Sequence, residues 1–142
     1  MFEPIVLKYE VDGQDFASAG MASEEVKSRM KQLGIAPQIV RKIAICMYEA
    51  EINLVIHGGG GTATVEIYPD RVELIMEDHG KGIENIELAM QEGYTTAPDN
   101  IRALGFGAGM GLPNMKKYSD KIKVESTVGV GTTVYMTIFL QS

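Results

Sequence analysis

Apolar and polar positions alternate in five stretches of this chain, which is the period of a β-strand with one covered face. The first stretch runs from Ile5 to Val11 and ends at Asp12-Gly13. The other four form two pairs, joined by the turn-forming sequences Pro69-Asp70 and Gly129-Val130-Gly131. Each pair is predicted to be an antiparallel hairpin. The four predicted strands are Thr62 to Tyr68, Val72 to Glu77, Lys121 to Ser126 and Thr132 to Leu140.

The clearest helical pattern opens with Pro37, a residue whose missing N–H costs nothing in a first turn. Glu49, Asn53 and His57 are spaced four apart, so they share a polar stripe that borders the core. A second, apolar stripe is predicted to be buried. Its members are Ile39, Ile43, Met47, Ala50 and Leu54.

Weaker periodicity predicts three further helices. Asp15 is expected to cap a helix that reaches about Leu33, although Gly20 interrupts its first turns. Two short helices are predicted at Ile86 to Met90 and Leu112 to Tyr118. The order is therefore strand, two helices, two strands, helices, two strands. This order predicts an α+β fold, a two-layer α/β sandwich whose mixed, largely antiparallel sheet is covered on one face. We expect residues 1–142 to form a single domain.

Composition narrows the range of partners. The net charge of −6 argues against binding to nucleic acid or to an anionic membrane surface. Cys46 is the single cysteine, which excludes an internal disulfide, and we expect it in the core. The first residues do not resemble a signal peptide and no apolar run reaches the length of a membrane span, so a cytoplasmic location is predicted.

Glycine occupies every second position from Gly105 to Gly111, directly before the predicted helix at Leu112. Glycines let bare backbone N–H groups approach a ligand, and a helix N-terminus attracts anions. This stretch predicts a phosphate site, with a flexible surface loop as the alternative.

Four motifs follow one another along almost the whole chain, and together they resemble the Bergerat-type ATP-binding fold of the GHKL superfamily. Within that superfamily the chain is most similar to the anti-sigma-factor serine/threonine kinases. The motifs are Glu49-Ala50-Glu51-Ile52-Asn53 with His57-Gly58, Glu77 to Ile83, Gly107 to Leu112, and Gly129 to Tyr135.

The resemblance implies binding of ATP and Mg²⁺ along the polar stripe. Asn53 offers an amide oxygen suited to Mg²⁺, and the alternative is an ordinary helix-surface residue. Glu49, one turn earlier, resembles the general base of the family. The alternative interpretation of Glu49 is a solvated helix residue, which is what we expect of Glu51.

The resemblance also implies an adenine site at the end of the second hairpin strand. Asp78 would accept a hydrogen bond from the exocyclic amine of adenine, beside Gly80, Gly82 and Ile83. Thr132 resembles the threonine that helps to hold adenine in the family. Turn capping for Asp78 and strand propensity for Thr132 are the alternatives.

The phosphates are expected at Gly107, Gly109 and Gly111 and at the helix N-terminus that begins near Leu112. The segment from Gly93 to Leu104 resembles a short ATP lid. Several charged residues are candidates to line the site or to neutralise phosphate, with a solvated surface position as the alternative for each. They are His57, Lys81, Arg102, Lys116 and Lys117.

The resemblance implies an ATP-dependent serine/threonine protein kinase that phosphorylates a small antagonist protein, the anti-anti-sigma (STAS-type) factor, and sequesters a sigma factor. Leu112-Pro113 resembles a second branch, the switch kinases, which activate a phosphatase by nucleotide-dependent binding. A detached ATPase module is a third alternative. The sequence leaves a homodimer open.

Overall fold

The structure is a computed structural model that describes residues 3–13, 19–56, 59–80, 82–83, 85–90 and 111–140. Several predictions fall outside these residues. They concern the Asp15 cap, His57, Lys81, the lid from Gly93 to Leu104 with Arg102, and Gly107 and Gly109.

Five strands form one sheet in the order β1-β2-β3-β5-β4, and all four pairings are antiparallel. Both predicted hairpins are confirmed, β2 with β3 and β4 with β5. The last strand lies between β3 and β4, so the centre of the sheet joins segments far apart in the sequence. The strands are β1 (Ile5–Asp12), β2 (Gly60–Ile67), β3 (Arg71–Asp78), β4 (Lys121–Thr127) and β5 (Gly131–Phe139).

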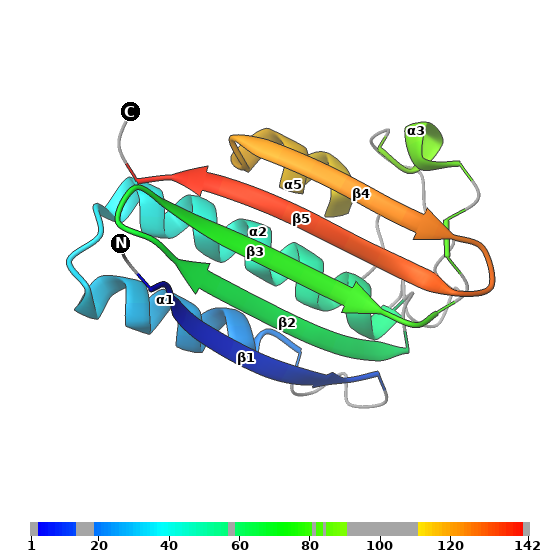
Figure 1. Ribbon diagram of the computed structural model, residues 1–142, viewed down its shortest axis with the longest axis horizontal. Helices are drawn as coiled ribbons and strands as arrows, with labels where there is room; N and C mark the ends of the chain where they lie inside the picture. Colours follow the sequence, from blue (N-terminus) through cyan, green and yellow to red (C-terminus); the bar gives the residue numbers. More distant parts are fainter. Residues whose placement is uncertain are drawn as a thin grey trace.

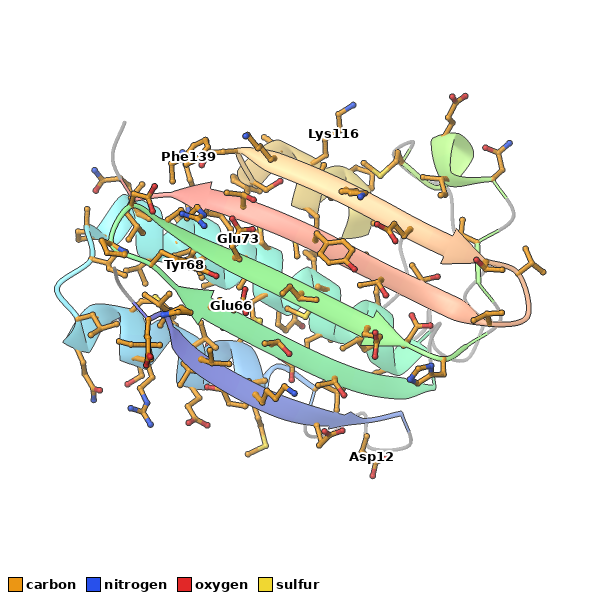
Figure 2. All side chains as sticks on the ribbon, in the orientation of Figure 1. Asp12, Glu66, Tyr68, Glu73, Lys116 and Phe139 are labelled. Atoms are coloured by element: carbon orange, nitrogen blue, oxygen red, sulfur yellow. The ribbon has the colours of Figure 1, made fainter. Side chains whose placement is uncertain are left out.

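Helices α1, α2 and α5 cover one face of the sheet, and the other face is open (Figure 1). The expected two-layer α+β sandwich is therefore confirmed, although the described sheet is antiparallel throughout rather than mixed. The open face carries a mixture of polar and aromatic side chains such as Glu66, Tyr68 and Glu73 (Figure 2). The helices are α1 (Met21–Gln32), α2 (Pro37–Ile56), α3 (Ile86–Ala89) and α5 (Gly111–Tyr118).

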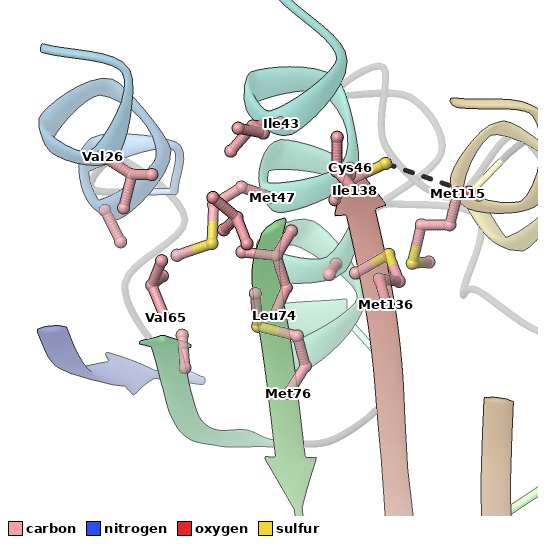
Figure 3. Packing of buried hydrophobic residues seen from close by; sticks show 14 of the residues in the cluster. Val26, Ile43, Cys46, Met47, Val65, Leu74, Met76, Met115, Met136 and Ile138 are labelled. Atoms are coloured by element: carbon pink, nitrogen blue, oxygen red, sulfur yellow. Dashed lines mark hydrogen bonds between the residues drawn. The ribbon is translucent and has the colours of Figure 1, made fainter. Parts of the chain in front are cut away.

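The core lies between the three covering helices and strands β2, β3 and β5 (Figure 3). All members of the predicted apolar stripe of α2 are buried, since none exceeds 9% exposure. Cys46 is also in this core, as predicted, and its thiol donates to the carbonyl of Met115 at 3.8 Å. Burial raises the pKa of the Cys46 thiol to about 12, so the group stays neutral and packs as an apolar side chain.

The predicted helix to about Leu33 does not run through Gly20 as expected, because α1 begins at Met21. Gly20 has φ of 100° and ψ of −10°, the left-handed conformation that glycine adopts readily and that a right-handed helix does not contain. Gly20 is therefore the residue at which the chain turns into α1.

Candidate active site

One part of the candidate site is the junction between the end of β3 and the start of β5. Asp78 Oδ1 accepts hydrogen bonds from the N–H groups of Gly80, at 2.9 Å, and Thr132, at 3.1 Å. The first bond is the turn cap that sequence reasoning offered as the alternative, and the second ties the turn to the other hairpin. Oδ2 takes part in neither bond, so among the described residues the carboxylate keeps an oxygen with which to accept from a ligand.

Ser126 of β4 hydrogen-bonds two backbone groups and one hydroxyl at this junction. Its hydroxyl oxygen accepts from the N–H of Ile83 at 2.7 Å and lies 2.8 Å from Oγ1 of Thr132. Ser126 also donates to the carbonyl of Gly131 at 3.2 Å, which leaves Thr132 as the donor in the hydroxyl pair. Thr132 is only 9% exposed, so it contributes an ordered hydroxyl rather than a solvated one.

Two glycines of this junction lie too close to neighbouring backbone for any side chain. A Cβ at Gly82 would lie 2.6 Å from the carbonyl oxygen of Thr127, and one at Gly131 would overlap the carbonyl oxygen of Asp78. Both positions also have positive φ, 82° and 147°. The turn after β3 and the hairpin between β4 and β5 are therefore packed backbone to backbone.

The second part of the candidate site lies where α2 faces the N-terminus of α5. A Cβ at Gly111 would lie 2.9 Å from Oδ1 of Asn53 and 3.1 Å from its Nδ2, so the first turn of α5 rests directly against this amide. Leu112 packs its side chain in the core, and its backbone N–H belongs to the first turn of α5, where N–H groups have no partner within the helix. The amide of Asn53 and the positive end of α5 thus point to the same place.

Glu49 lies one turn before Asn53 and is half-buried. Burial raises the pKa of the Glu49 carboxyl above its usual range, while a side-chain hydrogen bond with Asn114 on α5 partly opposes that rise. A carboxylate with a raised pKa is a stronger base than an exposed one. Glu49 therefore has the properties of a general base, and its hydrogen bond fixes its direction.

Glu51 is not the solvated residue that the sequence led us to expect. It is only 3% exposed, and its two carboxylate oxygens accept from the N–H groups of Ala22, at 3.2 Å, and Ser23, at 3.0 Å. These N–H groups belong to the first turn of α1, where a helix has no partners of its own and attracts negative charge. Glu51 is thus a structural residue that ties α2 to α1.

The residues chosen from the sequence form two groups. Asp78, Gly80, Gly82, Ile83 and Thr132 come together at the junction of β3 and β5. Glu49, Asn53 and Gly111 come together between α2 and α5. The ends of α2 and β3 and the start of β5 lie at the same end of the molecule (Figure 1).

Sequence reasoning missed two residues of these groups, Ser126 and Asn114. The register of the predicted hairpin contained a signal for Ser126, because it pairs with Thr132 across the two strands. We find no comparable signal for Asn114, which meets Glu49 only because α5 packs on α2.

Comparison with known proteins identifies the family of the chain. Residues 23–142 match the family described as histidine kinase-, DNA gyrase B-, and HSP90-like ATPase. The anti-sigma F factor of Priestia megaterium is 38% identical over 118 residues, which covers 78% of this chain and 77% of the relative. The anti-sigma F factor of Clostridium acetobutylicum is 38% identical over 116 residues and covers 78% of each chain.

A solved structure has the same fold. It is the crystal structure of the RsbU and RsbW domains of a Mycobacterium tuberculosis protein, with a TM-score of 0.61 and 14% sequence identity. The match covers 94% of this chain and 32% of that one. The chain therefore belongs to the histidine kinase-, DNA gyrase B- and HSP90-like (GHKL) ATPase family, and within it to the relatives of the anti-sigma F factors. Because members of this family bind ATP, ATP is the ligand considered for the two groups of residues.

The described residues limit what else the site holds. They include no group of three or more His, Cys, Asp or Glu side chains arranged to hold a metal ion. In many nucleotide sites Mg²⁺ takes most of its ligands from phosphate oxygens and water, so a single amide such as that of Asn53 fits as its protein ligand. None of the helices in the described part of the chain has the length and apolar character to cross a membrane.

Proposed function

We propose that this protein is an ATP-dependent serine/threonine protein kinase that acts as an anti-sigma regulatory factor. Its acceptor is a small antagonist protein of the anti-anti-sigma (STAS) type, and its second partner is a sigma factor. The similarity to anti-sigma F factors over more than three quarters of the chain supports the partners. We further propose that residues 1–142 act as one domain in the cytoplasm.

The observation that carries the kinase proposal is the arrangement of Glu49, Asn53 and the start of α5. A half-buried carboxylate with a raised pKa stands one helical turn from an amide that touches Gly111. A pure binding module has no need of an oriented base. Protein phosphotransfer uses one on the acceptor hydroxyl and a hydrolase uses one on water, so the similarity to anti-sigma F factors favours a protein acceptor over water.

In this proposal the adenine ring lies at the junction of β3 and β5. Oδ2 of Asp78 accepts from the exocyclic amine of adenine, and the Thr132 hydroxyl holds the ring edge, directly or through water. Gly80, Gly82 and Ile83 form the backbone next to the ring, because no side chain at Gly82 separates the turn from the hairpin. The bonds from Asp78 and Ser126 hold these groups in place before the ligand arrives.

The phosphates lie against Gly107, Gly109 and Gly111 and the N–H of Leu112, with Mg²⁺ at the Asn53 amide. When bound, Mg-ATP supplies the phosphoryl group together with part of the charge neutralisation. Glu49 takes the proton from the acceptor hydroxyl as the oxygen attacks, and the N-terminus of α5 stabilises negative charge on the phosphates.

The test is transfer of label from γ-labelled ATP to a purified STAS-type antagonist protein. The wild-type chain should label the antagonist on serine or threonine, and Glu49→Gln should bind the nucleotide but transfer no label. Label transfer by Glu49→Gln at the wild-type rate would remove Glu49 from the role of base. Nucleotide-dependent complex formation without any labelling would favour the switch-kinase alternative, whose Leu112-Pro113 feature forms the first turn of α5. Phosphate release that needs no acceptor would identify an ATPase module.

A further inference from the structure

A groove of about 670 Å³ lies between α1 and α2. Its α2 side is built from residues such as Arg41, Ile45 and Tyr48, which are on the opposite side of the helix from the buried stripe of Ile43 and Met47. The groove therefore opens away from the sheet, on the outer surface of the helical layer.

The groove has apolar walls that water can reach. Ile35 and Ile45 line it and are partly exposed, and Tyr48 exposes 41% of its surface. An exposed aromatic ring beside aliphatic side chains favours an amphipathic protein segment over a small polar ligand.

Charge is distributed unevenly along the groove. Lys31 and Arg41 stand near the end where α1 connects to α2. Lys27 precedes Lys31 by one helical turn of α1. Glu24 and Glu49 stand at the other end, because the two helices run in opposite directions (Figure 1). The groove is basic at one end and acidic at the end that contains the proposed base.

The three cations have no ion-pair partner within the part of the chain that the structure describes. They stand together in a protein whose net charge is −6. A partner carrying acidic side chains would meet free cations here, while most of the remaining surface would repel it.

We propose that this groove docks an acidic amphipathic segment of the protein acceptor and thereby brings its hydroxyl to Glu49. The inference rests on the proposed kinase function and adds the location and chemistry of the acceptor contact. Acidic side chains of the segment pair with Lys31 and Arg41, its apolar face covers Ile45 and Tyr48, and its hydroxyl-bearing residue lies at the Glu49 end.

The helix sets the spacing of these contacts. Glu49 follows Arg41 by eight residues, so the two lie about 12 Å apart along the axis of α2. About four residues of an extended segment, or about eight residues of a helical one, span that distance. The acceptor is therefore expected to carry acidic residues at one of these two distances from the modified serine or threonine.

The test uses fluorescein-labelled synthetic peptides and fluorescence anisotropy. One peptide is an amphipathic helix with glutamates two turns from a single serine, and the second keeps the apolar positions but has lysines in place of the glutamates. The wild-type chain should bind the acidic peptide at least about tenfold more tightly than the basic one at low salt, with the difference falling as salt rises.

Two variants with equal net charge separate local from global electrostatics. Lys27→Glu/Lys31→Glu/Arg41→Glu should weaken binding of the acidic peptide by at least about tenfold. Lys8→Glu/Lys121→Glu/Lys123→Glu, on the sheet away from the groove, should weaken it by less than about threefold. The single variants Lys31→Gln and Arg41→Gln should each show a smaller loss and provide the same comparison if the triple variant is poorly folded.

Equal loss in both triple variants, or binding of the basic peptide as tightly as the acidic one, would overturn the proposal. So would a change from dimer to monomer in the groove variant alone, measured by light scattering, because the occupant would then be a second copy of the chain. The peptide assay needs neither nucleotide nor phosphotransfer. If the groove variant alone loses the peptide while the wild-type chain labels no antagonist, the groove stands as a docking site and the kinase proposal fails.

Discussion

Asn114 on α5 hydrogen-bonds the carboxylate of Glu49 on α2. The same helix begins at Gly111, where its backbone touches the amide of Asn53. One short helix thus contacts both the proposed base and the proposed metal ligand. Any shift of α5 on binding phosphate would move the partner of Glu49 as well.

Asn114→Ala is expected to change the pH dependence of phosphotransfer. The Asn114 bond favours the ionised form of Glu49, so its loss should raise the pKa of that carboxyl further. Because the base has to be deprotonated, the acidic limb of the pH–rate profile should move to higher pH, while nucleotide affinity changes little. Lys121→Ala, at the exposed start of β4, is the control. An acidic limb that stays in place would show that Asn114 does not act through Glu49.

Asp78→Asn should weaken binding of adenine nucleotides by about tenfold or more, the usual range for losing a hydrogen bond to a charged group. The asparagine keeps an oxygen to accept from Gly80 and Thr132, so the fold should remain intact. Its NH₂ group would face the exocyclic amine of adenine, donor against donor. Titration with a fluorescent ATP analogue measures the effect. Asp70→Asn, in the turn between β2 and β3, controls for the lost charge, and equal affinities in all three proteins would refute the adenine role.

Gly111→Ala should reduce phosphotransfer and weaken the response to Mg²⁺. The new Cβ would stand 2.9 Å from Oδ1 of Asn53, so the amide has to move by a few tenths of an ångström. Displacement of a metal ligand on this scale is expected to lower the rate by about tenfold. Alanine is well tolerated in a helix, so the unfolding midpoint should stay near that of the wild type. Rates measured across a Mg²⁺ titration test this, and an unchanged titration curve would place the ion elsewhere.

Glu51→Ala should destabilise the fold without touching the nucleotide. It leaves the N–H groups of Ala22 and Ser23 buried without their acceptor, at a cost of about 2–4 kcal/mol. Glu51→Gln keeps one acceptor oxygen and should lose less. Urea unfolding measures the difference, with Glu25→Ala on the exposed side of α1 expected within about 0.5 kcal/mol of the wild type. A similarly small change in Glu51→Ala would mean that the capping bonds add little.

The helix α2 and both hairpins were predictable from sequence because their signals are local. The buried stripe of α2 recurs every three or four residues, and each hairpin has its turn between two alternating stretches. The insertion of β5 between β3 and β4 was not predictable in this way. It depends on pairing Leu74 with Met136, residues that no local pattern relates.

The candidate site shows the same difference between local signals and long-range contacts. Asp78 and Thr132 were found because they belong to recognisable motifs, and the structure joins them by a hydrogen bond. Glu51 was misjudged because a charged helix residue is expected to be solvated, although its position four residues after Met47 and three before Leu54 places it beside the buried stripe. Its burial results from the start of α1, whose position depends on the turn at Gly20, and that relationship exists only in the folded chain.

The raised pKa of Glu49 also predicts how its removal affects stability. Burial favours the protonated form in the folded state, so the folded pKa lies above the ordinary value of 4.5. The ionised carboxylate therefore destabilises the fold once the pH has passed through the folded pKa, and this penalty fades as the pH falls toward 4.5. Glu49→Gln should then melt at a higher temperature than the wild type at pH 7 to 8, with the two melting temperatures converging near pH 4. Solvent screens the exposed half of the side chain, so the gain in melting temperature is expected to be small.

Melting curves at several pH values measure this gain, and the exposed Glu125→Gln serves as the comparison. A melting temperature for Glu49→Gln below that of the wild type at neutral pH would show that the bond with Asn114 outweighs the burial of the charge.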